Sequence, residues 1–322
     1  MSSENHDQAG FTLVELMIAL TIFSFVIAGV LAVAVSTTQG YREQRQTIAA
    51  ESAARVPIDF IADALRQASP GVPDPTRMQD GITCVSGALT VTNNSGGLGP
   101  DKLDVIYASG AVVTSTQAAY TTGTTSLAVT DASSLSVGDF IVITNFDQGT
   151  LLKISAISTN TLTLNTQCGT ISLPSGGYAA GSLVVRAQHA TFYIGTQDGI
   201  PTLFMDPDSD ANATMPAEPL AEGIEDLQVA LGVDSGTDGV SENGAGANDD
   251  EWQYNFSGDS VLAGTLRAVR VTLVSRAAQV VSGGITPYSR PAIEDHAAGG
   301  ADAYKRRVLR TIVEIRNTGV SP

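Results

Sequence analysis

Residues 6–20 read HDQAGFTLVELMIAL, and within this stretch a polar start gives way to hydrocarbon side chains in a single step. Positions 11–35 comprise 25 residues, and Glu15 is the only charged residue among them. At about 1.5 Å per residue, a helix of this length spans roughly 37 Å, enough to cross a hydrocarbon core of about 30 Å. A charge there costs roughly 2.5–3.5 kcal/mol on insertion scales, so we expect Glu15 to be functional.

A cleaved secretory signal is the alternative interpretation of this segment, and it fits poorly. The ten residues before the apolar run contain no Lys or Arg, and the small residue Gly10 lies before the run rather than after it. The apolar run is also longer than the core of an ordinary signal peptide. We therefore favour a membrane helix over residues 11–35.

The residues after position 35 predict that the same helix continues. Ile48, Phe60, Ile61, Ala64 and Leu65 form one apolar stripe at helical spacing. The sequence Ser-Pro-Gly at 69–71 ends the pattern, so one helix is expected over about 11–68. Its second part, 36–69, is amphipathic and should pack on its own globular domain. Its first part needs lipid or further copies of the same helix.

Residues 70–322 predict a β-rich head. Short β-type runs separated by Gly, Thr, Ser and Asp predict antiparallel strands at 102–108, 126–129, 140–144, 151–157, 161–164, 183–189, 191–195, 201–204, 227–233, 269–273 and 309–315. Within the head, residues 118–185 read as an inserted small β-barrel or sandwich. The predicted fold class is α+β, a long N-terminal helix followed by an antiparallel sheet.

The charge distribution excludes some functions. Of the formal net charge of −16, fifteen acidic residues lie between positions 198 and 259, a region without Lys or Arg. Such a surface disfavours nucleic acid as a partner, because phosphate contacts need a basic face. From Arg267 onward the chain has nine basic and four acidic residues. These two poles could orient subunits head to tail, but we favour neighbouring strands that neutralise each other.

No catalytic motif is present. The three His residues stand outside any nucleophile, phosphate-loop or zinc-binding pattern, so we expect no enzymatic activity. Cys84 and Cys168 are the two cysteines, and they permit one disulfide in an oxidising compartment. The sequence leaves open whether the two cysteines meet.

Two acidic stretches have spacings that suit a hard cation. Asp206, Asp208 and Asp210 alternate along one stretch, and Asp234 and Asp238 lie in a Gly-rich second stretch. The first stretch lacks the Gly and Glu that an EF-hand requires at its sixth and twelfth positions. We favour solvated loops, with a Ca²⁺ site as the alternative and no other cofactor expected.

Two stretches carry a family resemblance. GFTLVELMIAL at 10–20 resembles the type III signal of type IV prepilins and pseudopilins, with a small residue, an aromatic residue and a Glu in fixed order. TLRAVRVTLVSRAA and YKRRVLRTIVEIRN, near the C-terminus, resemble strands of PilW-like minor pilins. Those pilins are related to the J-type minor pseudopilin of type II secretion.

The resemblance implies how the N-terminus is processed and used. A prepilin peptidase would remove the leader 1–10 by cutting between Gly10 and Phe11 and would N-methylate Phe11. The carboxylate of Glu15 would then pair with the new amine of a neighbouring subunit in the filament. A matched pair recovers much of the cost of burying either charge.

The resemblance also implies a function: a minor pilin that assembles through the helix at 11–35 and primes or caps a type IV pilus. Implied partners are the peptidase, other minor and major pilins, the inner-membrane assembly platform and lipid. The head would be periplasmic before assembly and extracellular afterwards, at the pilus tip. A type II secretion pseudopilin and a filament-borne adhesin or binding module are the alternatives.

The leader departs from the family pattern. It carries Glu4 and Asp7, and the first basic residues, Arg42 and Arg45, follow the apolar run. Counting positive charges would therefore place the wrong end in the cytoplasm. We nevertheless expect a cytoplasmic N-terminus, because the peptidase signal is more specific than a bias of two residues.

Overall fold

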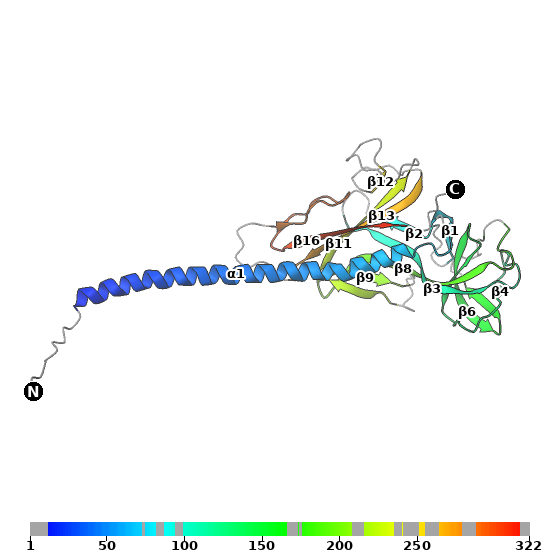
Figure 1. Ribbon diagram of the computed structural model, residues 1–322, viewed down its shortest axis with the longest axis horizontal. Helices are drawn as coiled ribbons and strands as arrows, with labels where there is room; N and C mark the ends of the chain where they lie inside the picture. Colours follow the sequence, from blue (N-terminus) through cyan, green and yellow to red (C-terminus); the bar gives the residue numbers. More distant parts are fainter. Residues whose placement is uncertain are drawn as a thin grey trace, which may run out of the picture. The chain divides into compact units, whose positions relative to one another are not determined.

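The computed structural model describes residues 12–72, 75–81, 87–93, 99–165, 173, 176–207, 216–234, 240, 251–254, 264–278 and 288–315. The chain forms two compact units, residues 1–48 and residues 49–322. Helix α1, Leu13–Arg66, contributes its first part to one unit and its last part to the other. The second unit contains every strand found among the described residues (Figure 1).

Helix α1 ends where the sequence predicts. Ser69 and Gly71 adopt φ values of 57° and 75°, a left-handed conformation that cannot continue a helix. The hydroxyl of Ser69 donates to the carbonyl oxygen of Val72 at 2.8 Å, which holds the reversal. The observed bounds, 13–66, fall within two residues of the expected bounds at each end.

The large sheet has ten strands, joined in the order β10-β9-β8-β5-β6-β7-β4 with β1, β2 and β3 attached at the side. Its strands are β1 Met78–Asp80, β2 Leu89–Thr92, β3 Lys102–Ser115, β4 Ser126–Ala128, β5 Phe140–Thr144, β6 Gly149–Ser158, β7 Thr161–Asn165, β8 Leu183–Gln197, β9 Ile200–Asp206 and β10 Glu218–Glu222. A short 3-10 turn, Pro75–Arg77, precedes β1. Among the described pairings only β1 with β6 is parallel, so the antiparallel prediction is confirmed with one short exception.

Strand β8 joins the parts of the large sheet. It pairs with β3 over residues 183–192, with β5 over residues 183–187 and with β9 over residues 191–197. The sequence predicted two strands, 183–189 and 191–195, on either side of Ala190. The structure has one strand there, because Ala190 is fully buried and no turn residue separates the two runs.

A small antiparallel sheet has the order β12-β11-β13-β16. Its strands are β11 Ile224–Asp234, β12 Trp252–Gln253, β13 Thr265–Arg276 and β16 Arg306–Glu314. A two-stranded ribbon, β14 Tyr288–Ser289 with β15 Ala301–Asp302, lies between β13 and β16 in the sequence. The predicted strands at 227–233, 269–273 and 309–315 are therefore all present.

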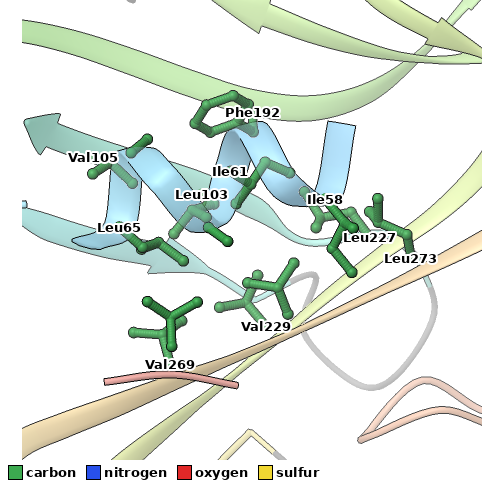
Figure 2. Packing of buried hydrophobic residues seen from close by; sticks show 14 of the residues in the cluster. Ile58, Ile61, Leu65, Leu103, Val105, Phe192, Leu227, Val229, Val269 and Leu273 are labelled. Carbon is green, nitrogen blue, oxygen red and sulfur yellow. The ribbon is translucent and has the colours of Figure 1, made fainter. Parts of the chain in front are cut away.

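The last turns of α1 form the centre of the main core. Ile58, Ile61 and Leu65 are at most 4% exposed and contact both sheets. Figure 2 shows Phe192 on one side of the helix and Val229 on the other. Of the predicted apolar stripe, Ile61, Ala64 and Leu65 are therefore buried in the head, whereas Ile48 and Phe60 are 66% and 40% exposed.

The predicted inserted module has its own core but shares a sheet with the rest of the head. Tyr120, Leu127, Ile141, Leu162 and Tyr178 belong to a separate cluster of buried side chains. However, β5 pairs with β8 over five positions, so the backbone ladder runs continuously from the module into the head (Figure 1). The module at 118–185 is therefore an extension of the large sheet.

Candidate functional site

Glu15 takes part in a capping box in the first turn of α1. Its Oε2 accepts hydrogen bonds from the backbone N–H and from the hydroxyl of Thr12, both at 3.0 Å. The Thr12 hydroxyl oxygen accepts in return from the backbone N–H of Glu15, at 3.3 Å. The first N–H groups of a helix lack intrahelical partners, so this exchange stabilises the start of α1.

Among the described residues, only one of the two carboxylate oxygens of Glu15 accepts hydrogen bonds. Within the described part of the chain, its hydrogen bonds all end on Oε2, and Oε1 remains available to a further donor. The role of Thr12 was not predicted from the sequence. The Thr-x-x-Glu spacing at 12–15 is the signal that could have revealed it.

The helix that carries Glu15 is apolar and exposed on all sides over its first part. Leu13, Phe23, Phe25 and Val33 are each between 63% and 80% exposed. The hydroxyls of Thr21 and Ser24 donate to carbonyls one turn back, at 2.8 and 2.7 Å, so they need no outside acceptor. By length and composition, α1 is the one described helix able to cross a membrane.

Only some of the other expected processing and binding residues lie among the described residues. Gly10, Phe11, Cys84, Cys168, Asp208, Asp210 and Asp238 lie outside the described residues. Asp206 ends β9 opposite Thr191. Asp234 ends β11, is 5% exposed and pairs with Arg267 at 3.2 Å. No group of three potential metal ligands occurs among the described residues, and the Ca²⁺ site stays a prediction.

A segment over residues 288–302, which we term the strap, is held against β11 and β13 by buried ion pairs. Glu294 of the strap pairs with Arg270 of β13 at 2.7 Å, and the two side chains are 2% and 3% exposed. Arg270 also stacks on Trp252, 4.2 Å from the ring centroid. Each buried charge therefore has a partner, as buried charges require.

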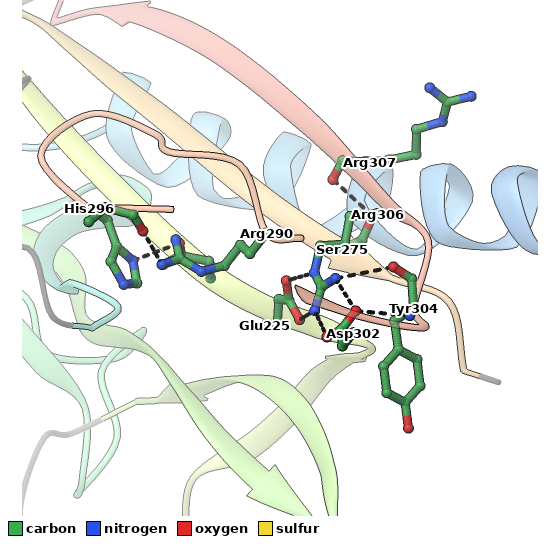
Figure 3. Close-up of polar contacts among 10 residues, drawn as sticks. Glu225, Ser275, Arg290, His296, Asp302, Tyr304, Arg306 and Arg307 are labelled. Carbon is green, nitrogen blue, oxygen red and sulfur yellow. Dashed lines mark hydrogen bonds and ion pairs between the residues drawn. The ribbon is translucent and has the colours of Figure 1, made fainter. Parts of the chain in front are cut away.

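Two further ionic contacts fasten the strap at its ends (Figure 3). In the first contact, the carboxylate of Asp226 pairs with Arg290 at 2.7 Å and lies 2.8 Å from His296 Nδ1. At the other, the guanidinium of Arg306 lies between Asp302 and Glu225. The hydrogen bonding that Arg306 donates to Asp302 raises the pKa of Arg306 and holds the pKa of Asp302 below its ordinary value.

These contacts support the neutralising interpretation of the charged poles for the described residues. The C-terminal basic residues Arg267, Arg270, Arg290, Arg306 and Arg310 each lie against a carboxylate. Three of these carboxylates, Asp234, Asp226 and Glu225, belong to the acidic stretch at 198–259, so neighbouring segments neutralise each other at these three contacts. His189 and His296 are both buried: His189 lies 3.6 Å from Asp80, and His296 contacts Asp226.

Comparisons with known proteins match both ends of the chain. Residues 191–317 match the family described as Type IV pilus-assembly protein W, and residues 5–31 match the prokaryotic N-terminal methylation motif. No curated protein matches the chain. Among solved structures, a type IV-like pilin, TTHA1219 from Thermus thermophilus, is 12% identical with a TM-score of 0.36, covering 83% of this chain and 96% of its own.

The apolar helix, the methylation motif and the β head define a pilin-type protein, a subunit that is anchored by its N-terminal helix and then assembled with other pilins. Within that class, the match over β9, β11, β13 and β16 identifies the chain as a PilW-like minor pilin of the type IV pilin superfamily. This family is structural rather than enzymatic, and the methylation motif implies that the chain is a substrate of prepilin peptidase.

Proposed function

We propose that this minor pilin primes or caps a type IV filament. Prepilin peptidase cuts between Gly10 and Phe11 and methylates Phe11, and the subunit then assembles through the apolar part of α1. The observation that carries this proposal is the exposed helix of Leu13 to Val35, whose single charge, Glu15, is already held in a capping box. Such a helix needs lipid first and neighbouring helices afterwards.

Glu15 acts as the registering charge of assembly. Thr12 holds Oε2, and Oε1 receives the amine created at Phe11 of a neighbouring subunit. Because an unpaired charge in an apolar surrounding is costly, only the register that joins the two charges is stable. The capping box fixes the carboxylate at the start of the helix, one turn from Phe11 along the chain.

The partners follow from this role. They are the peptidase, other minor and major pilins, the inner-membrane assembly platform and, before assembly, lipid. The N-terminus faces the cytoplasm and the head faces the periplasm until the subunit leaves the membrane for the pilus tip.

Processing is tested by substituting the residue before the cut. Gly10→Ala should leave an uncleaved chain, ten residues longer, that never enters filaments. Gly40→Ala is the matched control: it makes the same change within α1, where an added Cβ meets no atom within 4 Å. Normal maturation of Gly10→Ala, measured by mass spectrometry of the N-terminus, would contradict the cleavage site.

The charge of Glu15 can be separated from its capping role. Glu15→Gln keeps an oxygen that accepts from the Thr12 N–H but removes the negative charge. We expect this variant to be cleaved and inserted normally and to be lost from sheared filaments. Thr12→Ala should do the reverse, weakening the first turn by about 0.5–2 kcal/mol while leaving the charge. Equal incorporation of Glu15→Gln and wild type would refute the charge role.

The type II secretion and adhesin alternatives differ in what a deletion removes. Loss of surface pili and twitching supports the pilus, and loss of enzyme secretion would support a pseudopilin. A defect confined to adhesion would support a filament-borne adhesin or binding module, presented by the extension of the large sheet at 118–185.

Two smaller proposals concern residues largely outside the described part. Ca²⁺ binding by Asp206, Asp208 and Asp210, or by Asp234 and Asp238, predicts heat release and thermal stabilisation at millimolar Ca²⁺. For Asp234 the ion would have to share the carboxylate with Arg267. A disulfide between Cys84 and Cys168 predicts a mass that rises by about 2 Da on reduction.

A further inference from the structure

Strand β16 differs from the other edge strands of the two sheets. Among the described residues it pairs only with β13, in a regular antiparallel register over nine positions. The other edge strands, β1, β2, β4, β10 and β12, are two to five residues long. Of these the longest, β10, contains Pro219 and a register shift beside it. Short strands, Pro and bulges prevent edge pairing, and β16 has none of these protections.

The outward face of β16 carries apolar side chains beside charged ones. Leu309, Thr311 and Val313 face the core, where Val313 is 2% exposed. On the opposite face Ile312 is 55% exposed, and Arg310 and Glu314 flank it two positions away on either side. The side chain of Arg310 is 50% exposed. The sequence of this face around Ile312 is therefore basic, apolar, acidic.

This pattern is complementary to itself. In an antiparallel pair of two identical strands, residues whose numbers add to a constant lie opposite each other and on the same face. If Ile312 lies opposite Ile312 of a second copy, Arg310 lies opposite its Glu314 and Glu314 opposite its Arg310. On the other face Leu309 would meet Ile315 of the second copy, and Thr311 would meet Val313.

We propose that β16 is a docking edge for a second copy of this chain, which adds its own β16 antiparallel about a two-fold axis at Ile312. The two small sheets then form one continuous sheet with an isologous interface, in which each contact occurs twice. The inference goes beyond the proposed pilin function and does not depend on it.

The existing contacts of Arg310 are compatible with this pairing. Its Nε donates to the Thr272 hydroxyl at 3.3 Å, and its Nη2 lies 2.9 Å from Glu294 Oε1. A guanidinium has five N–H donors in a planar fork, so donors remain for a second carboxylate. Glu314 is exposed at the far end of the strand and supplies that carboxylate. Glu294 orients Arg310 from within the same chain.

Cysteine trapping in the membrane of cells that express the full chain tests the register. The two Cα atoms of directly opposite residues lie about 4.5–5.5 Å apart, within the range of a disulfide. Ile312→Cys should therefore form a disulfide-linked dimer under mild oxidation, beyond the level seen for the wild-type cysteines. Val308→Cys is the matched control: it is 43% exposed on the same strand, yet its two copies would be roughly 27 Å apart.

A charge variant tests complementarity in the same assay. Glu314→Lys places like charges opposite each other at both symmetric contacts and should lower the Ile312→Cys dimer yield roughly tenfold. Glu218→Lys makes the same charge change on the edge strand β10 and should leave the yield unchanged. Unfolding midpoints equal to that of the wild type confirm that the variants are folded, as expected for exposed positions.

Each outcome counts for or against the proposal. A dimer trapped at position 312 and not at 308, and weakened only by Glu314→Lys, supports β16 pairing. The proposal would be overturned if Ile312→Cys formed no dimer, or if Val308→Cys formed a dimer in equal yield. It would also be overturned if Glu314→Lys and Glu218→Lys changed the dimer yield equally. The dimer yield does not depend on processing or pilus assembly. A failure of the pilin proposal can therefore be distinguished from a failure of β16 pairing.

Discussion

Arg270 and Glu294 form a bidentate ion pair in the interior of the head. Nε of Arg270 donates to Oε1 at 3.1 Å and Nη2 donates to Oε2 at 2.7 Å. Thr272 donates a third hydrogen bond to the same carboxylate at 3.2 Å. Glu294 adopts φ 50°, a conformation that non-glycine residues seldom take, and the pair holds it there. Buried charged pairs therefore hold the strap, together with the buried side chain of Ile293.

Removal of the charge on Glu294 should destabilise the head strongly. Glu294→Gln preserves shape but leaves Arg270 buried without a counter-charge, and breaking such a pair costs about 3–5 kcal/mol. Chemical unfolding of the full chain in detergent can be followed by Trp252, the only tryptophan, which stacks on Arg270. Glu51→Gln removes the exposed pair with Arg55 and should leave the unfolding free energy nearly unchanged, because solvent screens exposed ion pairs. Similar costs for the two variants would contradict a role for burial.

Much of the fold could be predicted from apolar periodicity alone. The helical stripe containing Ile61 and Leu65 and the alternation of Val269, Val271 and Leu273 appear in the structure as the two sides of one core. The strap could not be predicted in this way. Its ion pairs join residues 24 and 64 positions apart, and no local pattern signals such pairs.

In the same way, the sequence predicted those functional residues whose signal is local and missed those whose contacts are distant in the sequence. Glu15 stands out because one charge interrupts a long apolar run, and that signal is local. The buried environment of His296 depends on Asp226, 70 positions earlier, and single-sequence patterns do not carry such information. The parallel pairing of β1 with β6 is missed likewise, because three residues are too few for a period.

Truncation of Ile61 should reveal how much the helix contributes to the head. Ile61 is fully buried between the two sheets, so Ile61→Ala loses apolar burial and leaves a cavity, at a cost of about 2–5 kcal/mol. Val56→Ala, on the same helix but 74% exposed, should change the unfolding free energy by no more than about 0.5 kcal/mol. If Ile61→Ala behaved like Val56→Ala, the last turns of α1 would not be part of the core.

The acid sensitivity of the head should depend on Asp302 and Asp295 in opposite directions. The hydrogen bond from Arg306 lowers the pKa of Asp302, so this residue contributes stability that is present at neutral pH and is lost as the pH falls through its lowered pKa. Burial raises the pKa of Asp295, so its contribution falls as the pH rises from its ordinary pKa through the raised value.

The two Asn variants therefore serve as controls for each other. Asp302→Asn should flatten the loss of stability below about pH 4, and Asp295→Asn should remove the decline above it. Unfolding midpoints measured between about pH 2 and pH 7 compare the two profiles. Parallel shifts of both variants at every pH would show that neither carboxyl titrates differently in the folded chain.

Gly177 is required for a close approach of two backbone segments in the extension of the large sheet. Tyr120 and Tyr178 exchange two backbone hydrogen bonds, at 2.8 and 2.9 Å, and a Cβ on Gly177 would collide with the Tyr120 carbonyl oxygen. Gly177 also has φ +71°, whereas Gly181, with φ +88°, has no atom within 4 Å of an added Cβ. Gly181→Ala should therefore cost only the backbone strain, about 1–3 kcal/mol, and Gly177→Ala should cost more. Amide exchange at Tyr120 and Tyr178 should accelerate in Gly177→Ala alone. Equal unfolding free energies for the two variants would show that the strand contact can shift without cost.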